Sequence, residues 1–427
     1  MESELKTASQ RERKVFDLNN AFKPATPINR LELFAGRNSQ IQDVVGTISL
    51  QGQHIILYGE RGVGKTSLAN MIFPNLRSAG RPVLTPMTNC SSQDTFQLIW
   101  QRVFREIFDQ CNSLNIPIID GDGENLVDLY ELSTPDEIRR GLTKFGTDAE
   151  LVVILDEFDV IQDSITRQTV ADTIKFLSDK MSPVTIVLIG VADDIDDLID
   201  DHASIERCIV QIPMPRMHWN EICSIVENGL KSVSMGIEKN ALEQCAFIAK
   251  GLPHYAHLFG LYSGRAAVAR ESLTVDVNDI QSGLGTALNR VQASIRSSYA
   301  KAVTSSHKEA LFKEVLLACS LAKTDDFGYF YPVDILPALE RIRGKNLGVE
   351  AYARHLHLFC EDERGPILVK DERLNRPRYR FVNPLMTPYV IMEGISQKLL
   401  GNDTLQTWLE KDHGSIKKSQ GHLFATD

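Results

Sequence analysis

The sequence predicts an α/β fold that contains a mainly parallel sheet. Apolar runs at 54–58, 150–155 and 184–190 have the length and continuity of strands that are covered on both faces. Segments with helical apolar spacing lie between them, at 96–108 and 165–181. Because strands and helices alternate along the chain, we expect the strands to run parallel, with helices packed on both faces of the sheet.

A glycine-rich turn follows the first apolar run. Residues 59–66 read Gly-Glu-Arg-Gly-Val-Gly-Lys-Thr, which fits the phosphate-binding pattern G-x-x-x-x-G-K-[ST] between a strand and a helix. Glycines let backbone N–H groups approach phosphates, and a helix start adds partial positive charge. We therefore expect ATP here, with Lys65 reaching the β- and γ-phosphates and Thr66 holding Mg²⁺. The alternative is a chance glycine-rich turn. The expected cofactor-binding residues are Gly59, Glu60, Arg61, Gly62, Val63, Gly64, Lys65, Thr66 and Ser67.

Two acids, Asp156 and Glu157, end the second apolar run. At the carboxyl end of a central strand, Asp156 would lie beside the phosphate loop and orient the Mg²⁺ shell. Glu157 would polarise the attacking water as a catalytic base. Thr66 and Asp156 are thus the expected metal residues, and Lys65 and Glu157 expected catalytic residues. The alternatives are a helix N-cap for Asp156 and a solvated surface acid for Glu157.

The C-terminal part of the chain shows a different pattern. Helical spacing covers 310–322, 333–343 and 348–360, and short strands follow at 367–370 and 379–382. Three helices followed by a β-hairpin predict a winged helix, which places one helix in the major groove of DNA and its hairpin on the backbone.

Basic side chains gather in this predicted winged helix, and they predict salt-dependent contacts with the phosphates of double-stranded DNA. Nearby acids such as Glu361, Asp371 and Glu372 dilute the positive charge. Packing of this domain onto the α/β core is therefore the alternative to DNA contact. The basic positions are Arg341, Arg343, Lys345, Arg354, His355, His357, Lys370, Arg373, Arg376, Arg378 and Arg380.

The remaining pattern divides the chain into consecutive segments. Within the core, 82–87 is expected to be a strand, and Ser91 or Ser92 to cap the helix that begins at Phe96. The region after the core shows helical spacing and no strand, which predicts a small helical lid. The predicted segments are an N-terminal arm (1–30), the ATPase core (31–215), the helical lid (216–300), the winged-helix domain (301–400) and a C-terminal tail (401–427).

Composition is ordinary for a soluble globular protein, with 43% hydrophobic and 24% charged residues in a chain of 427. A net charge of −10 argues against nucleic-acid binding by the whole surface, so DNA contact requires a local basic patch. The seven cysteines are scattered without a C-x-x-C pair, which argues against a zinc ribbon and a disulfide framework and favours the cytoplasm. No apolar stretch reaches membrane-spanning length, and the first residues lack the apolar segment of a secretory signal.

Residues 24–395 resemble the AAA+ P-loop ATPases of the origin-recognition (Orc/Cdc6) type and the related STAND signalling ATPases. Phe34-Ala35-Gly36-Arg37 resembles the lead-in motif that these families place near the adenine, which implies that Arg37 binds nucleotide. Ser204-Ile205-Glu206-Arg207 resembles their arginine-finger segment, which implies that Arg207 is a catalytic residue for a neighbouring subunit. Arg216 is a second candidate for that role. Pairing with the acids between 193 and 201 is the alternative for either arginine.

The resemblance also implies roles for residues in two further segments. Gly251-Leu252-Pro253-His254 stands at the sensor-2 or G-x-P position, which implies that Pro253 packs near the adenine and that His254 reports phosphate. A structural histidine is the alternative, and the usual sensor-2 arginine is missing. Asp193 is the nearest candidate for the polar sensor-1 residue.

Two functions fit these expectations. The first is an ATP-hydrolysing, DNA-associated switch that grips duplex DNA through its winged helix. The second is a STAND-like signalling or defence ATPase that forms a homo-oligomer and recruits a separate effector protein. Both need the same ATP and Mg²⁺ site.

Overall fold

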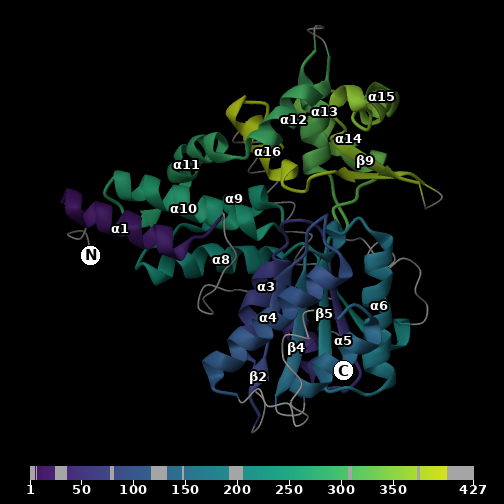
Figure 1. The fold of residues 1–427 in the computed structure, drawn as a ribbon. Coiled ribbons are helices and arrows are strands. Elements are labelled where there is room, and N and C mark those ends of the chain that lie inside the picture. The colour runs from purple at the N-terminus through teal and green to yellow at the C-terminus, as the bar shows by residue number, and fades with distance from the viewer. Residues whose placement is uncertain are drawn as a thin grey trace, which may run out of the picture. The chain divides into compact units, whose positions relative to one another are not determined.

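The computed structural model describes residues 5, 7–24, 36–76, 81–116, 132–146, 149–191, 205–305, 310–372 and 376–401 (Figure 1). The chain forms two compact units. One unit comprises Pro27–Pro215, and the other comprises Met1–Thr26 together with Arg216–Asp427.

The unit Pro27–Pro215 contains a six-stranded parallel sheet, which confirms the predicted α/β fold. The strand order is β2-β4-β5-β1-β6, and β3 also pairs with β4. Every residue of β4 from Leu151 to Asp156 is buried, so both faces of the sheet are covered there. The strands are β1 (His54–Tyr58), β2 (Val83–Leu84), β3 (Met87–Asn89), β4 (Glu150–Asp156), β5 (Val184–Gly190) and β6 (Ile209–Pro213).

The strand predicted at 82–87 is divided in two. Between β2 and β3 lies Pro86, which has no N–H to donate to the sheet. The N–H of the preceding Thr85 donates instead to the Gln110 side chain, at 2.8 Å. The sheet resumes where the Pro86 carbonyl accepts from the Ile154 N–H, at 2.9 Å.

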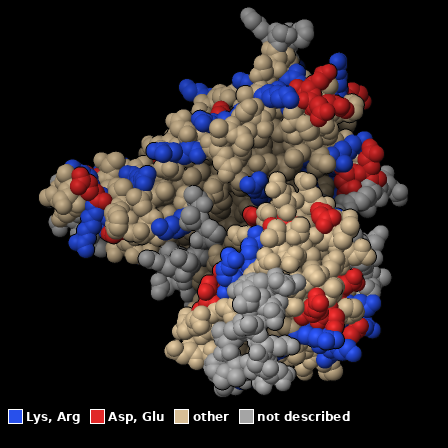
Figure 2. All heavy atoms as spheres, in the orientation of Figure 1, with Lys and Arg blue, Asp and Glu red and all other residues tan. Residues whose placement is uncertain are grey.

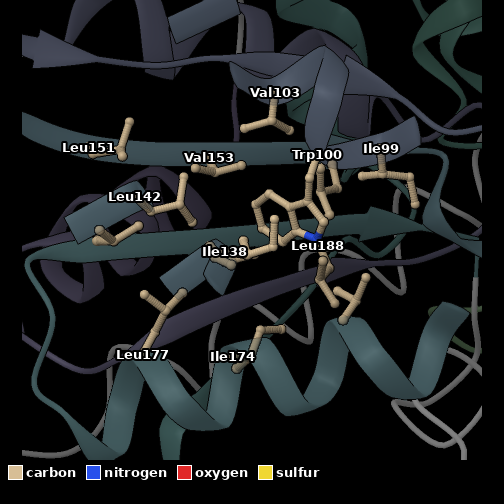
Figure 3. Packing of buried hydrophobic residues seen from close by; sticks show 14 of the residues in the cluster. Ile99, Trp100, Val103, Ile138, Leu142, Leu151, Val153, Ile174, Leu177 and Leu188 are labelled. Atoms are coloured by element: carbon tan, nitrogen blue, oxygen red, sulfur yellow. The ribbon is translucent and has the colours of Figure 1, made fainter. Parts of the chain in front are cut away.

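Helices α4, α5 and α6 supply the apolar core on the side of the sheet that carries Leu151 and Val153. Figure 3 shows Trp100 and Val103 of α4 next to Val153, with side chains of α5 and α6 in the same cluster. Helix α4 is capped by Thr95, whose hydroxyl accepts from the Leu98 N–H, so the predicted cap at Ser91 or Ser92 was wrong. The helices of this unit are α2 (Asn38–Ile48), α3 (Lys65–Ile72), α4 (Phe96–Leu114), α5 (Pro135–Gly146) and α6 (Ser164–Asp179).

In the second unit, the segment predicted as a helical lid contains a small strand pair. Gly236–Ile237 (β7) and Thr274–Val275 (β8) pair in parallel, so the expectation of a lid without strands was wrong. Strands of two residues carry no periodic pattern from which they could be predicted. The helices of this region are α8 (Trp219–Ser232), α9 (Lys239–Ala249), α10 (Pro253–Ala269) and α11 (Val277–Arg290).

The N-terminal arm forms helix α1 (Ala8–Ala21), which packs against α8 and α10. Thr7 and Gln10 close its first turn as a capping box. Phe22 follows the helix, is 1% exposed, and lies against Gly229 of α8 and Gly260 of α10. The absence of side chains on these two glycines makes the notch that the Phe22 ring fills.

The C-terminal region has the three helices and the hairpin expected from the sequence. Phe330 also forms an antiparallel bridge with Tyr379 of the hairpin. Helix α16 closes the region and contacts α9, α11 and α13. Of the predicted tail (401–427), residues 402–427 lie outside the described residues. The elements are α12 (Ala293–Val303), α13 (Phe312–Leu321), α14 (Pro332–Arg343), α15 (Glu350–Leu358), β9 (Leu368–Asp371), β10 (Arg378–Phe381) and α16 (Met386–Ser396).

Within the described ranges, no helix is both long and apolar enough to cross a membrane. All seven cysteines lie in these ranges as free thiols.

Candidate active site

The turn at 59–64 joins β1 to α3 at the carboxyl edge of the sheet, and its glycines permit its shape. Gly59 has φ +153°, and a Cβ there would lie 2.4 Å from the carbonyl oxygen of Met214. Gly64 has φ +98° and immediately precedes the first residue of α3. No other residue type fits the close approach at Gly59 without movement of the backbone.

Lys65 is folded back onto this turn. Its Nζ donates to the carbonyl oxygens of Gly59, at 2.8 Å, and Glu60, at 2.9 Å. Burial lowers the pKa of Lys65 from 10.5 to about 8, although the nearby carboxylates of Asp159, Asp156 and Glu60 work against that shift. The turn therefore holds a buried cation whose present partners are neutral carbonyls, which an anionic ligand can replace.

Thr66 and Asp156 meet across two elements. The Thr66 hydroxyl donates to Asp156 Oδ2 at 2.7 Å, and Asp156 is 2% exposed at the end of β4. Mg²⁺ prefers oxygen ligands at about 2.0–2.1 Å in an octahedron, whose neighbouring oxygens are about 3 Å apart. The pair of oxygens therefore fits two adjacent positions of one Mg²⁺ shell after a small movement.

Glu157 sits on a strained turn directly after Asp156. Its backbone is left-handed, with φ +56° and ψ +35°, and its side chain is exposed. The other carboxylate oxygen of Asp156 accepts from the Glu157 N–H at 2.8 Å and holds this turn in place. A non-glycine residue in this conformation costs about 1–2 kcal/mol, and such strain is typical of functional sites.

Asp159 is a residue of the site that the sequence reasoning did not single out. Its carboxylate accepts from the Val191 N–H at 2.8 Å, just after the end of β5, and it is the acid with the largest effect on the pKa of Lys65. It lies three residues after Asp156, and the spacing D-E-x-D was the available signal. The predicted sensor residue, Asp193, lies outside the described residues.

Arg37 was expected near the adenine, and the structure places its guanidinium on the phosphate loop itself. Its Nη2 donates to the Val63 carbonyl at 3.0 Å and to the Pro215 carbonyl at 2.6 Å. The side chain is 4% exposed. Arg37 thus stabilises the loop by joining Val63 to Pro215. Of the motif assigned to it, Phe34 and Ala35 lie outside the described residues.

The remaining loop residues divide by exposure. Glu60 and Val63 are buried, and Arg61 is exposed. Gly62 has φ +88°, and Ser67 lies partly buried in the first turn of α3.

Arg207 lies near the amino-terminal ends of the strands, whereas the loop lies at their carboxyl ends. It precedes β6, whose first residue pairs with His54 at the start of β1, whereas the loop follows the end of β1. Its guanidinium pairs with Asp179 at 2.5 Å, and its side chain is 72% exposed. An exposed pair of this kind contributes little stability. Arg207 does not reach the loop of its own chain.

Pro253 and His254 belong to the other compact unit, so their role at the nucleotide stays a prediction. Pro253 is the first residue of α10. His254 Nδ1 lies 2.5 Å from the carbonyl oxygen of Pro24 and donates to it. Burial lowers the pKa of His254, and this hydrogen bond opposes the shift. Within the described residues His254 therefore holds the end of the N-terminal arm.

Residues 49–199 match the family model described as an AAA domain. The ORC1-type DNA replication protein 1 of Halobacterium salinarum is 26% identical over 195 residues, which cover 44% of this chain and 53% of that protein. The ORC1-type DNA replication protein 2 of Thermoplasma acidophilum is 27% identical over 228 residues, 50% of this chain and 52% of that protein. The chain thus spans about half the length of the curated relatives it matches.

The fold as a whole is similar to a solved structure. The Walker-type ATPase PABY2304 of Pyrococcus abyssi aligns with a TM-score of 0.54 at 15% identity, over 86% of this chain and 98% of that one.

Proposed function

We propose that this chain, an ORC/Cdc6-like protein with an AAA+ P-loop domain, is a Mg²⁺-dependent ATPase that acts as a nucleotide-controlled switch. The observation that carries the proposal is the 2.7 Å contact between Thr66 and Asp156, which joins the phosphate loop to the acid-ended strand. Loop, cation and acid pair then lie at one edge of the sheet, where the chemistry of ATP hydrolysis needs them.

The proposed mechanism assigns each step to a residue. Lys65 exchanges its carbonyl partners for the β- and γ-phosphate oxygens, and the backbone N–H groups of the loop bind the same phosphates. Thr66 and Asp156 hold Mg²⁺, which when bound offsets the charge that develops on the phosphate oxygens. Glu157 orients the attacking water and accepts its proton. Arg207 of a second copy supplies a fixed positive charge to the γ-phosphate.

Loss of single side chains tests this assignment. Lys65→Ala is expected to abolish binding of Mg-ATP, because the phosphates lose their principal cation. Glu157→Gln is expected to bind Mg-ATP normally and to hydrolyse it at least about a hundredfold more slowly. Lys180→Ala removes an exposed lysine from the same unit and serves as the control. Calorimetry and a phosphate-release assay measure the two properties, and wild-type turnover in Glu157→Gln would rule out the base.

Association with duplex DNA through a C-terminal winged helix is the second part of the proposal. Arg354 on α15 and Arg376 before β10 are exposed and suit contacts with phosphates. Other cations of the region are already paired: Arg378 with Asp371 and Asp325, and Lys370 with Glu372. Figure 2 shows basic and acidic side chains side by side around α14 and α15, which fits weak, salt-dependent binding better than a tight grip.

A salt titration tests the DNA contact. Arg354→Ala is expected to weaken binding to random duplex about equally for every sequence and to reduce the salt slope by about one. Arg13→Ala on the exposed side of α1 removes the same charge as a control. Absence of binding at low salt, with or without ATP, would exclude this part of the proposal.

The paired state of the hairpin cations favours a second candidate. Here the C-terminal helices pack on the lid and restrain it, as the hydrogen bond from the Tyr255 hydroxyl to the Leu385 carbonyl, at 2.7 Å, suggests. ATP would then promote assembly into a homo-oligomer that recruits an effector protein in the cytoplasm, where the seven free thiols stay reduced. Sedimentation velocity with and without Mg-ATP measures the assembly, and an unchanged sedimentation coefficient would contradict this candidate.

A further inference from the structure

We propose that a cavity beside Thr66 binds inorganic phosphate, and that it receives the phosphate produced by ATP hydrolysis; the second half of this proposal rests on the proposed function. The cavity has a volume of about 580 Å³ and lies wholly within the unit Pro27–Pro215. Its lining is Thr66, Asn70, Met87, Thr88, Asn89, Arg102, Arg105 and Glu106.

The cavity adjoins the candidate metal site through two connections. Thr66 lines the cavity and at the same time donates to Asp156. Asn89, which also lines it, pairs in register with Asp156 across β3 and β4. A phosphate group that leaves the edge of the sheet at Asp156 therefore meets this cavity directly.

One guanidinium of the lining is fixed in position. Arg102 pairs with Asp94, whose side chain is 6% exposed. Burial pushes the pKa of Asp94 upward, but the hydrogen bonds from Arg102 and Ser91 outweigh this effect and hold the pKa below its ordinary value. The Nε of Arg102 is buried and has no hydrogen-bond partner among the described residues. Asp94 thus holds Arg102 in place, and the unsatisfied Nε can donate to a ligand after a small shift of the side chain.

A second polar group without a hydrogen-bond partner lies on strand β3. Thr88 is 5% exposed, and its hydroxyl has no hydrogen-bond partner in the part of the chain that the structure describes. A buried hydroxyl without a partner is unfavourable, and a hydrogen bond to a ligand oxygen relieves this cost. Arg105 lies exposed at the rim, and the amides of Asn70 and Asn89 add further donors. A lining so rich in donors fits an oxyanion.

Glu106 selects among oxyanions. It is the acid of the lining and, with all its oxygens acting as acceptors, it opposes a fully ionised anion. Hydrogen phosphate carries an O–H that can donate to this carboxylate, whereas sulfate near neutral pH carries none. The structure therefore assigns the cavity to phosphate in preference to sulfate.

Direct binding of inorganic phosphate tests the site without requiring hydrolysis. Calorimetric titration of phosphate into the full chain saturated with Mg-ADP is expected to show saturable binding, and sulfate is expected to bind more weakly. Arg105→Ala is expected to weaken phosphate binding about tenfold or more, as for a charged hydrogen bond, and Arg105→Lys less so. Arg140→Ala, an exposed arginine of α5, is the charge-matched control. Wild-type phosphate affinity in Arg105→Ala would overturn the proposal.

A separate variant tests the preference for phosphate over sulfate. Glu106→Gln keeps the shape of an exposed side chain and is expected to bring the affinities for phosphate and sulfate together. If the preference for phosphate persists in Glu106→Gln, the assigned role of this carboxylate is wrong.

Lys65→Ala separates this inference from the proposed function. That variant should lose ATP binding yet retain phosphate binding, because Lys65 does not line the cavity. Normal ATP turnover without saturable phosphate binding would exclude the cavity proposal alone. Phosphate binding in a wild-type protein that fails to hydrolyse ATP would exclude the ATPase and the product-receiving role, while the phosphate site would stand.

Discussion

At the scale of single residues, strain and charge are concentrated around Asp156. Its two carboxylate oxygens accept from Thr66 and from the Glu157 N–H, so one buried acid positions both the hydroxyl of the loop and the turn of the proposed base. Replacement of Asp156 would leave both donors without their acceptor.

The strain at Glu157 has a measurable consequence. Glu157→Gly is expected to raise the free energy of unfolding by about 1 kcal/mol, because glycine adopts φ +56° without steric cost, and to abolish ATP turnover. Ser234→Gly relieves a similar conformation, φ +55°, in the other unit and should leave turnover unchanged. Chemical denaturation and an ATPase assay measure the two effects. A less stable Glu157→Gly protein would contradict the strain argument.

The lowered pKa of Lys65 should make the proposed nucleotide binding sensitive to alkali. In the folded protein the ammonium loses its proton above about pH 8, whereas the unfolded chain retains it up to about pH 10.5. The cost of burying this charge is therefore present below pH 8 and is relieved as the pH rises through that interval. Affinity for Mg-ATP should fall as the pH rises past 8, because the phosphates then meet a neutral amine.

Equilibrium binding of a fluorescent ATP analogue, measured on both sides of pH 8 at saturating Mg²⁺, checks this expectation. Lys65→Arg keeps its charge throughout and should flatten the profile. A wild-type affinity that does not change across this range would show that Lys65 is not the principal phosphate cation.

At the scale of elements, the docking of α1 depends on two glycines. A Cβ on Gly260 would lie 2.2 Å from the Phe22 ring, so Gly260→Ala is expected to displace Phe22 and to cost about 1–3 kcal/mol. Gly285→Ala on α11 meets nothing within 4 Å and should be neutral or stabilising. Limited trypsin digestion at Arg11 and Lys14 reports release of the helix. Equal resistance of both variants would contradict the notch.

Elements with a strong local pattern could be predicted from the sequence, and those set by distant contacts could not. The apolar runs of β1, β4 and β5 and the helices at 312–321 and 332–343 follow directly from residue periodicity. The cap of α4 could not be predicted correctly, because Asp94 engages Ser91 and leaves Thr95 to cap the helix. Likewise the bracing position of Arg37 depends on Pro215, which is 178 residues away.

At the scale of the whole molecule, buried histidines are expected to lower the stability of the fold in acid. Burial lowers the pKa of His54 and of His257 from 6.5 to about 4. The unfolded chain therefore binds protons below pH 6.5 that the folded protein does not, and stability is lost as the pH falls toward 4. Each histidine contributes up to about 3 kcal/mol to this loss.

His257→Leu should reduce this acid sensitivity, because neither ring nitrogen of His257 has a hydrogen-bond partner among the described residues. The drop in melting temperature between neutral and mildly acidic buffer measures the effect, and His218→Leu at an exposed position is the control. An unchanged drop in His257→Leu would show that His257 is protonated in the folded protein.

Some residues of the candidate site could likewise be predicted from the sequence, and others could not. Thr66 and Asp156 could be placed together from the sequence, because a loop after one parallel strand and an acid at the end of another meet at the same sheet edge. Asp159 and the cavity lined by Arg102 could not, because they depend on how α4 and β5 approach that edge.

The two hydrogen bonds of Arg37 tie the phosphate loop to the last residue before the chain crosses into the second unit. Guanidinium groups are planar and rigid, so a displacement of the Val63 carbonyl moves the group that also holds the Pro215 carbonyl. A change in the shape of the loop would therefore displace the backbone at Pro215 through the Arg37 side chain alone.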